Sequence, residues 1–560
     1  MVRKVIEFAA RNRFLVLLAY ALLIAVGVWA TLDTPLDAIP DVSDNQVIVY
    51  ADWAGRSPQL VEDQVTYPLA SSLQGLGDLK AVRAQSMFGF SIVYVIFYDR
   101  VDIYWARTRV LERLNGIASV LPAGVVPRLG PEGTGVGHVF WYTLHSDRHD
   151  LAQLRAIQDW YLKLGLQSTM GVAEVASVGG FVKQYQINLD PLKMSARGVT
   201  LDVVASAVRR SNNDVGGRLL EIGQSEYIVR GIGYFRSLQD IADVVVAAPN
   251  GVPITIASLG TVSAGPQLRR GLLEENGRGE VVGGIVVARY GENAKEVIER
   301  VKVRLRELEK GLPEGVTIHV GYDRSALIER AVGTLKTALT EEAIIVSIVA
   351  IVFLLHFGSA FTVLVGLPLS ILFSFIMMRM FGITSNIMSL GGVALAIGEI
   401  VDASIVMVEN AHRHLTEGGE RARLNRIETV INASKQVGPA IFGSLLVMIA
   451  SFLPVFLLTG QEGKLFRPLA FTKTFAMVGA SIIAITLVPV LMTFFMRGRM
   501  RPESHNPVNR FFTRSYEPLL RWSLKHRKAM LAANVLALIL AVPMMTSLGR
   551  EFMPPLDEGS

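Results

Sequence analysis

The sequence predicts an α/β protein that is also a membrane protein, with a bundle of transmembrane helices and one large soluble insertion. The 560-residue chain is 51% hydrophobic, which is too apolar for an ordinary soluble protein and too long for one domain. Apolar runs of about 20 residues, the length that spans a bilayer, occur at 14–32 and again beyond residue 337. Between them, residues 33–338 alternate strand-like and helix-like patterns.

The composition excludes several classes of function. The chain has no cysteine, so a soft metal ion would have to bind methionine or histidine. The net charge of +6 is modest and its basic residues gather in segments expected to be cytoplasmic, so we expect no nucleic-acid partner. No nucleotide-binding loop, zinc motif or Ser-His-Asp spacing is evident. We therefore expect neither an enzyme nor an ATP-driven pump.

The N-terminal segment, 1–32, predicts a first transmembrane helix with a cytoplasmic N-terminus. Four basic residues precede the apolar run over 14–32. This run is longer than the apolar core of a signal peptide, and no small-residue cleavage site follows it. We expect the helix to be retained in the mature protein.

The first part of the insertion, 33–132, has the β-α-β-β-α order of a split βαβ unit. The expected strands are Val47–Trp53, Ala81–Gln85 and Ser91–Phe97, and the expected helices are Gln59–Leu73 and Ile103–Val120. Each strand has the apolar alternation, and each helix the amphipathic period, that these assignments require. We therefore expect one compact α/β subdomain here.

A second copy of the pattern is interrupted by an inserted lobe at 190–270, which holds a helix at Leu201–Ser211 and many glycines. Its first part covers 133–189 and its completion covers 271–337. The expected strands are Val139–Leu144, Ala173–Val178, Tyr185–Leu189, Val281–Ala288 and Thr317–Gly321, and the expected helices are Leu151–Leu166 and Ala294–Lys310. This internal duplication predicts two quasi-symmetric subdomains.

Six further membrane spans follow. They are expected at 338–357, 360–381, 387–409, 437–459 and 470–496, which form one block over 338–496, and at 528–547. Basic residues crowd 411–435 and 497–527, so both segments should be cytoplasmic. Counting crossings from a cytoplasmic N-terminus agrees and places 33–338 on the outer side. Within 497–527, residues 511–524 mix aromatic and basic side chains, as an amphipathic helix on the inner membrane surface does.

The span at 387–409 carries acidic side chains. Glu399 and Asp402 lie inside it and Glu409 at its end, and at about 100° per residue they fall on one face of a helix. A carboxylate at the bilayer centre costs about 2.5–3.5 kcal/mol even on insertion scales. The carboxylates could be protonated or paired packing groups, but a proton or cation pathway is the better interpretation. For His412 and His414, which follow, a solvated helix end is favoured over a metal site.

Several stretches in order resemble the heavy-metal branch of the resistance-nodulation-division (RND) exporters. They are Pro35–Asp44, Glu62–Pro68, Leu129–Gly137 and Gly460–Phe466. In addition, Ile397–His412 is similar to the copper- and silver-exporting (Cus-type) members. The resemblance covers the whole chain, but members of the family are longer, so it is to the N-terminal half of such an exporter.

The resemblance implies a fold, an activity and partners. The two split βαβ units would be ferredoxin-like porter subdomains, and 190–270 a docking lobe, on the periplasmic side of a bacterial inner-membrane helix bundle. The activity would be proton antiport that exports Cu(I) or Ag(I) as substrate, without a cofactor. The partners would be a periplasmic adaptor (membrane fusion) protein and an outer-membrane channel, around a homotrimer. The resemblance also implies that a second half of the transporter begins at 548–560 and is otherwise missing.

Two departures favour monovalent metals. Where multidrug and divalent-metal members carry aspartates, this chain has Ala403 and Ala396. In the opposite direction, Glu399 stands where the Cus-type pattern has a small residue. A divalent-metal or multidrug RND exporter, or a non-transporting RND-like receptor or scaffold, remains as the alternative. With Asp402 as proton carrier, Glu399 and Glu409 are expected to share the relay, whose other members would lie in the missing half.

Methionines are the expected metal ligands, because thioether sulfur suits Cu(I) and Ag(I). Position and the Cus-type pattern point to four of them, Met388, Met407, Met477 and Met492. Met407 and Met492 lie near the cytoplasmic ends of their spans, and the other two lie nearer the outer side. Methionine is also a flexible core filler, so packing is the alternative. The Cus-type pattern has further methionines at Ile400 and Leu268, so the relay is incomplete.

Overall fold

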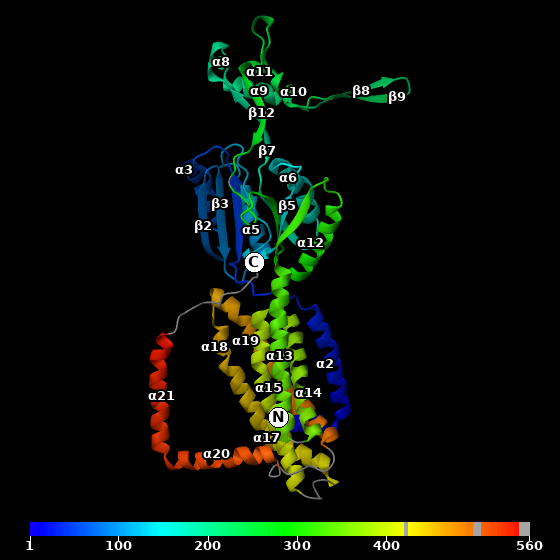
Figure 1. The fold of residues 1–560 in the computed structure, drawn as a ribbon, viewed down its shortest axis with the longest axis vertical. Coiled ribbons are helices and arrows are strands. Elements are labelled where there is room, and N and C mark those ends of the chain that lie inside the picture. Colours follow the sequence, from blue (N-terminus) through cyan, green and yellow to red (C-terminus); the bar gives the residue numbers. More distant parts are fainter. Residues whose placement is uncertain (270, 355, 419–423, 497–505, 548–560) are drawn as a thin grey trace. The chain divides into compact units, whose positions relative to one another are not determined.

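The computed structural model (Figure 1) describes residues 1–269, 271–354, 356–418, 424–496 and 506–547. The chain forms two compact units. The first unit comprises Met1–Val139, Ala288–Glu299 and Asp323–Ser560, and the second comprises Phe140–Val287 and Arg300–Tyr322. The expected start of a second periplasmic half at 548–560, and residues 497–505 of the basic segment, lie outside the described residues.

The first porter subdomain is a four-stranded sheet in the order β2-β3-β1-β4. Its elements are β1 (Gln46–Asp52), a continuous helix made of α3 (Pro58–Val61), η1 (Glu62–Thr66) and α4 (Tyr67–Leu73), then β2 (Leu79–Met87), β3 (Phe90–Phe97), α5 (Ile103–Ile117) and β4 (Arg128–Leu129). Asp102 begins α5 by accepting a hydrogen bond from the Trp105 amide at 2.8 Å, a preferred N-cap arrangement. Alternate residues of β1, Val47, Val49 and Ala51, are buried in the core with side chains of these helices.

The second porter subdomain has the same topology. Its elements are β5 (His138–His145), α6 (Leu151–Ile157), η3 (Gln158–Leu162), α7 (Lys163–Gln167), β6 (Val172–Gly179), β13 (Val282–Ala288), α12 (Ala294–Glu309) and β14 (Thr317–Asp323). The sheet order is β14-β5-β13-β6. If the strands of each subdomain are numbered in chain order, both sheets read fourth, first, third, second from one edge to the other. The internal duplication that the sequence predicted is therefore present.

One strand has a different partner from the one expected. The strand at Tyr185–Leu189 forms as β7 (Lys183–Leu189), but it pairs with β12 (Gly260–Pro266) and takes no part in the porter sheet. The reason is packing, because Ile187 and Leu189 lie against the core of the inserted lobe. We propose that the lobe begins with β7 rather than at residue 190.

The rest of the lobe is built from short elements. They are α8 (Pro191–Ala196), α9 (Leu201–Ser211), the hairpin of β8 (Val215–Ile222) and β9 (Ser225–Gly231), α10 (Leu238–Ala242), β10 (Val245–Ala247), η4 (Pro249–Gly251), β11 (Ile254–Thr255) and α11 (Ile256–Leu259). Both strands of the β8–β9 hairpin are exposed along their whole length. The hairpin extends away from the small core of the lobe (Figure 1).

Seven helices in the described part of the chain are long and apolar enough to cross a membrane, the number that the sequence predicted. They are α2 (Arg13–Asp33), α13 (Arg324–Leu354), α14 (Phe357–Phe381), α15 (Ile387–Glu417), α17 (Arg426–Ser451) with α18 (Leu453–Phe456), α19 (Gly460–Phe495) and α21 (Arg527–Ser547). Several extend beyond the expected spans, because a polar helical turn outside the apolar run is invisible to hydropathy. The span expected at 437–459 is divided at Phe452, just before Pro454, where proline ends a helix.

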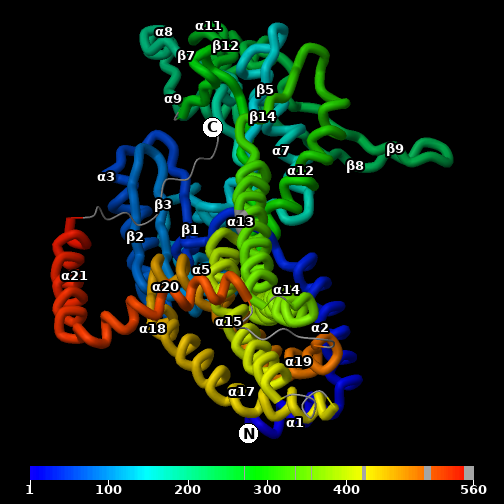
Figure 2. The backbone as a smooth tube through the Cα atoms, turned by 60° about the horizontal axis from the view of Figure 1, so that its bottom comes forward, coloured from blue at the N-terminus to red at the C-terminus, as the bar shows by residue number. Residues whose placement is uncertain are grey.

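The core of the bundle is formed by α19 and α15. In the most apolar 18-residue stretch of each helix, 83% of the residues are buried in α19 and 56% in α15. In α21 none of them is buried. Helices α15, α17 and α19 lie side by side (Figure 2). A short first helix, α1 (Val2–Arg11), buries Ile6, Ala9 and Ala10 and packs against α17 and α19. The amphipathic helix expected at 511–524 is present as α20 (Pro507–Lys525).

Candidate proton and metal pathway in the helix bundle

The position of α15 is fixed at its N-terminal end. Asn386 caps the helix by accepting hydrogen bonds from the amides of Met388 and Ser389, each at 3.0 Å. The Thr472 hydroxyl of α19 donates to the Ser389 carbonyl at 2.7 Å. One turn on, a side chain at Gly392 would lie 2.2 Å from Thr472 Oγ1. Only glycine therefore allows α15 and α19 to approach this closely, as small residues do in membrane helix pairs.

Glu399 forms an ion pair that the sequence analysis missed. The Lys473 Nζ of α19 lies 2.9 Å from Glu399 Oε1, and only 8% of the lysine side chain is exposed. The ammonium group also lies 3.8 Å from the centre of the Phe452 ring, within the range of a cation–π interaction. The other carboxylate oxygen, Oε2, is buried without a hydrogen-bond partner in the described residues. The available signal was a lysine within an otherwise apolar stretch of α19.

Asp402 lies apart from this ion pair. It is exposed on α15, on a face that it shares with Leu395 and Val406, which are 55% and 44% exposed. The three carboxylates were expected on one face, but Glu399 turns toward α19 while Asp402 remains uncovered. Glu409 is half-buried two turns further on. Asp402 is thus on a helix surface that the described part of the chain leaves without a packing partner.

Three of the four expected metal-ligating methionines share one apolar core. Met407, Met477 and Met492 are at most 1% exposed and belong to the cluster that α15, α17 and α19 build. Met388 is half-buried in the first turn of α15 and lies outside that cluster. Met477 and Met492 are 15 residues apart on α19, about 22 Å at 1.5 Å per residue, so they cannot share one ion.

The histidines at the C-terminal end of α15 differ from each other. His412 is 3% exposed, and its Nε2 has no hydrogen-bond partner among the described residues. The expectation of a solvated helix end is therefore wrong for His412, because the helices packed around α15 bury this side of it. His414 is exposed and its Nε2 lies 2.8 Å from Gln436 Oε1, in agreement with that expectation.

A cavity of about 390 Å³ lies at the N-terminal end of α15. Its wall includes residues from three of the stretches that resemble heavy-metal RND exporters. These stretches are remote from one another in the sequence and cover Pro35–Asp44, Leu129–Gly137 and Gly460–Phe466. Its acidic lining residues are Asp41, Asp44, Asp99 and Glu132. Lys464 of α19 crosses it to pair with Asp99 at 2.8 Å. A low-dielectric recess lined by carboxylates concentrates cations.

Replacing Lys473 by methionine is expected to destabilise the bundle by about 3 kcal/mol. This is the low end of the range for breaking a buried ion pair, because the Glu399 side chain keeps 31% of its exposure. The measurement is the midpoint of thermal unfolding of the purified chain in detergent. The double variant Lys473→Met with Glu399→Gln should recover most of the loss, because no unpaired charge remains.

Lys464→Met is the matched control for this prediction. Lys464 lies on the same helix and also pairs with a carboxylate, but Asp99 is 41% exposed, so its loss should cost less than about 1 kcal/mol. Equal destabilisation by the two single variants, or no recovery in the double variant, would contradict the importance of the Glu399–Lys473 pair.

Comparison with known proteins identifies the family of the chain. The family model described as "AcrB/AcrD/AcrF family" matches residues 5–560. The chain is 47% identical over its whole length to the cation efflux system protein CusA of Escherichia coli strain K12, of which it covers 54%. It is 46% identical to the putative cation efflux system protein SilA of Salmonella typhimurium, again covering 54%. It is 37% identical to the cation efflux system protein CzcA of an Alcaligenes species.

A solved structure gives the same result for the fold. The crystal structure of a heavy metal efflux pump superposes with a TM-score of 0.83 at 31% identity, over 98% of this chain and 53% of the pump. The chain thus spans about half the length of the relatives that it matches. With the family model matching almost every residue, the chain belongs to the AcrB/AcrD/AcrF family of RND transporters, and within it to the Cus-type heavy-metal efflux branch.

Proposed function

We propose that this chain works in the proton-driven efflux of monovalent heavy-metal ions, Cu(I) and Ag(I), across the bacterial inner membrane. The observation that carries the proposal is the pairing of two helices, α15 with its intramembrane carboxylates and α19 with its buried methionines. The relatives are efflux proteins, so the chain is assigned to transport rather than enzyme catalysis. The activity is that of the complete transporter, meaning this chain together with the remaining half that its relatives have.

In this proposal Asp402 is the proton carrier. Its exposed position on α15 leaves it available to a cation from another helix. A carboxylate that alternates between such a cation and a bound proton couples proton entry to a change in helix packing. Glu399 is held by Lys473, so we assign it to fixing the distance between α15 and α19. Glu409, half-buried near the C-terminal end of α15, would receive or release the proton on that side.

The metal path in this proposal follows the methionines. Met407, Met477 and Met492 are enclosed in an apolar core, and their thioether sulfurs favour a soft monovalent ion over a hard divalent one. Met388, in the first turn of α15, would be the member nearest the acidic cavity. Ions would pass between successive single-methionine positions, each completed by a ligand on another helix.

The proposed setting is a homotrimer with residues 33–338 in the periplasm. The exposed β8–β9 hairpin belongs to the proposed docking lobe. A periplasmic adaptor protein and an outer-membrane channel would complete the export system. These partners follow from the resemblance to the Cus-type branch.

Deleting the gene in its native host is expected to lower tolerance to copper and silver several-fold and to leave tolerance to zinc, cobalt and organic toxicants unchanged. The physical reason is the preference of thioether ligands for soft monovalent ions. Growth inhibition by each compound is the measurement, with re-expression of the complete transporter as the control. Selective loss of zinc tolerance would indicate a divalent-metal exporter, and loss of tolerance to organic compounds a multidrug exporter. Unchanged tolerance to all of them would indicate a receptor or scaffold.

A further inference from the structure

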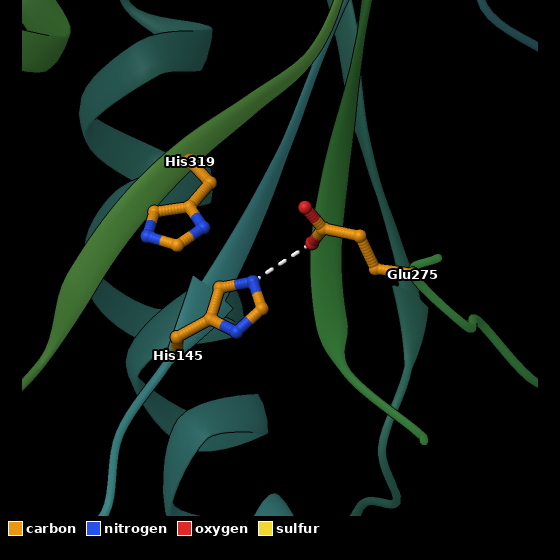
Figure 3. A group of neighbouring side chains, drawn as sticks. All are labelled: His145, Glu275 and His319. Atoms are coloured by element: carbon orange, nitrogen blue, oxygen red, sulfur yellow. Dashed lines mark hydrogen bonds and ion pairs between the residues drawn. The ribbon is translucent and has the colours of Figure 1, made fainter. Parts of the chain in front are cut away.

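Three potential metal-ligating side chains meet in the second unit, outside the membrane helices. They are His145 at the end of β5, His319 in β14 and Glu275 in the segment that leads from the inserted lobe to β13 (Figure 3). One ligand atom of each lies within 4.8 Å of the others. These residues are separated by up to 174 positions in the chain, and only the fold brings them together.

Glu275 is held in place by its turn. It precedes Asn276 and Gly277, whose φ angles are +55° and +67°, and its carbonyl accepts a hydrogen bond from the Arg278 amide at 3.1 Å. Two consecutive residues at positive φ are the mark of a type I′ hairpin turn, for which Asn-Gly is the preferred sequence. The Val281 amide and the Leu273 carbonyl close the hairpin at 2.9 Å. The carboxylate is therefore presented from a defined hairpin.

The carboxylate is also oriented by its neighbours. Glu275 Oε2 accepts a hydrogen bond from the Thr143 hydroxyl at 2.6 Å and lies 2.7 Å from His145 Nε2. The Thr143 hydroxyl and the His145 ring hold the pKa of Glu275 below its usual range. Thr143 and His145 are two residues apart on β5 and so lie on the same face. Oriented ligands with such supporting hydrogen bonds are typical of metal sites.

The two histidines are stacked, with ring centres 4.2 Å apart and 25° between the planes. A neutral imidazole is the form that binds metal ions. The ring edges that carry a nitrogen turn toward the carboxylate (Figure 3), so one position beside the stack is within reach of all three groups.

We propose that His145, His319 and Glu275 form a binding site for a divalent transition-metal ion of the Zn²⁺ class. Two imidazoles and one carboxylate are a known ligand set for zinc with a fourth position open to water. Bonds of about 2.0–2.1 Å in tetrahedral geometry place ligand atoms about 3.3 Å from one another. His145 Nε2 and Glu275 Oε2 are already closer than this, at 2.7 Å. The ligand atom of His319, which lies within 4.8 Å of the others, would have to approach them by at most about 1.5 Å. The exposed His319 is free to make this movement by rotation of its side chain.

The site differs in kind from the proposed export path. Among the described residues it contains no methionine ligand, and it joins three parts of the second unit, strands β5 and β14 and the hairpin at 273–281. A bound ion would attach the segment returning from the inserted lobe to the porter sheet. The proposal does not depend on which ion the transporter exports.

The test is titration of the purified, metal-free 560-residue chain in detergent with Zn²⁺ alone, followed by calorimetry. We expect the wild-type chain to bind one Zn²⁺ ion at this site. The His319→Gln variant should lose this binding or bind the ion with much lower affinity. Removing a group that only supports a ligand costs about 10–100-fold in affinity, so removing a ligand should cost about 100-fold or more. Thr143→Val, which keeps the shape of the side chain and all three ligands, should weaken binding by about 10–100-fold.

His138→Gln is the matched control, because His138 lies at the opposite end of the same strand, about 23 Å away at 3.3 Å per residue. It should bind Zn²⁺ as the wild type does. Circular dichroism of each variant tests for misfolding. Because His319 is exposed, its replacement by glutamine should not disturb the fold. An unchanged Zn²⁺ isotherm in His319→Gln, or the same loss in His138→Gln, would overturn the proposal.

Discussion

Asp402→Asn is expected to abolish proton-coupled metal export by the complete transporter while leaving its folding intact. The amide has the size of the acid but cannot take up a proton at physiological pH. Asp402 is exposed on α15, so the substitution disturbs no packed core of this chain, and surface changes of this kind usually alter stability by less than about 0.5 kcal/mol. The measurement is Cu(I) or Ag(I) accumulation in inverted vesicles under an imposed pH gradient.

Two variants control this experiment. Asp402→Glu retains a titratable carboxylate and should keep a measurable part of the activity, whereas Asp402→Asn should fall to the background of empty vesicles. Glu399→Gln with Lys473→Met removes the neighbouring ion pair without removing Asp402, and should keep proton coupling if the pair only spaces the helices. Normal proton-coupled export by Asp402→Asn would exclude Asp402 as the carrier.

Combining Met407→Leu with Met492→Leu is expected to eliminate most of the copper and silver tolerance that the complete transporter confers. Both side chains are fully buried, and leucine preserves their volume and apolar character, so the packing cost should remain below about 1.5 kcal/mol per site. Leucine has no sulfur to bind a soft ion. Tolerance is measured as growth on Cu(I)- and Ag(I)-containing medium at matched protein level.

Met378→Leu provides the comparison for this pair of substitutions. Met378 is as deeply buried as Met407 and Met492, but it lies on α14 in a separate cluster with Phe375, Leu390 and Phe475. Its replacement should leave tolerance unchanged. If the Met407 and Met492 substitutions were equally harmless, these methionines would be packing residues and the metal path would have to run elsewhere.

The features that sequence predicted well are those with a local pattern. The strands and helices of both porter subdomains follow from alternation and amphipathic period, and the membrane helices follow from apolar length. Tyr185–Leu189 shows the limit of this reasoning. Its strand character is local and was predicted, but its partner, β12, lies about 75 residues later and was decided by packing of the inserted lobe.

The candidate site also has features that the sequence reveals locally and features that only the fold creates. The carboxylates of α15 are conspicuous because they interrupt an apolar run, whereas the partner of Glu399 is contributed by a helix 74 residues away. Helical periodicity placed Glu399 and Asp402 in one sector, but it could not indicate which edge of that sector α19 covers. The His145–Glu275–His319 group was missed for the same reason, since its members are distant in the chain and match no spacing motif. Only the Asn-Gly turn beside Glu275 was a local signal.

The Glu399–Lys473 pair also has a consequence for the insertion of α15 into the membrane during translation. At about 5–20 residues per second, the 74 residues between the two partners take roughly 4–15 s to emerge from the ribosome. During that interval Glu399 lacks the lysine that later pairs with it, and an unpaired charge at mid-bilayer costs about 2.5–3.5 kcal/mol on the insertion scale. Release of α15 into lipid should therefore wait for α19, so that the two helices leave the translocation channel together.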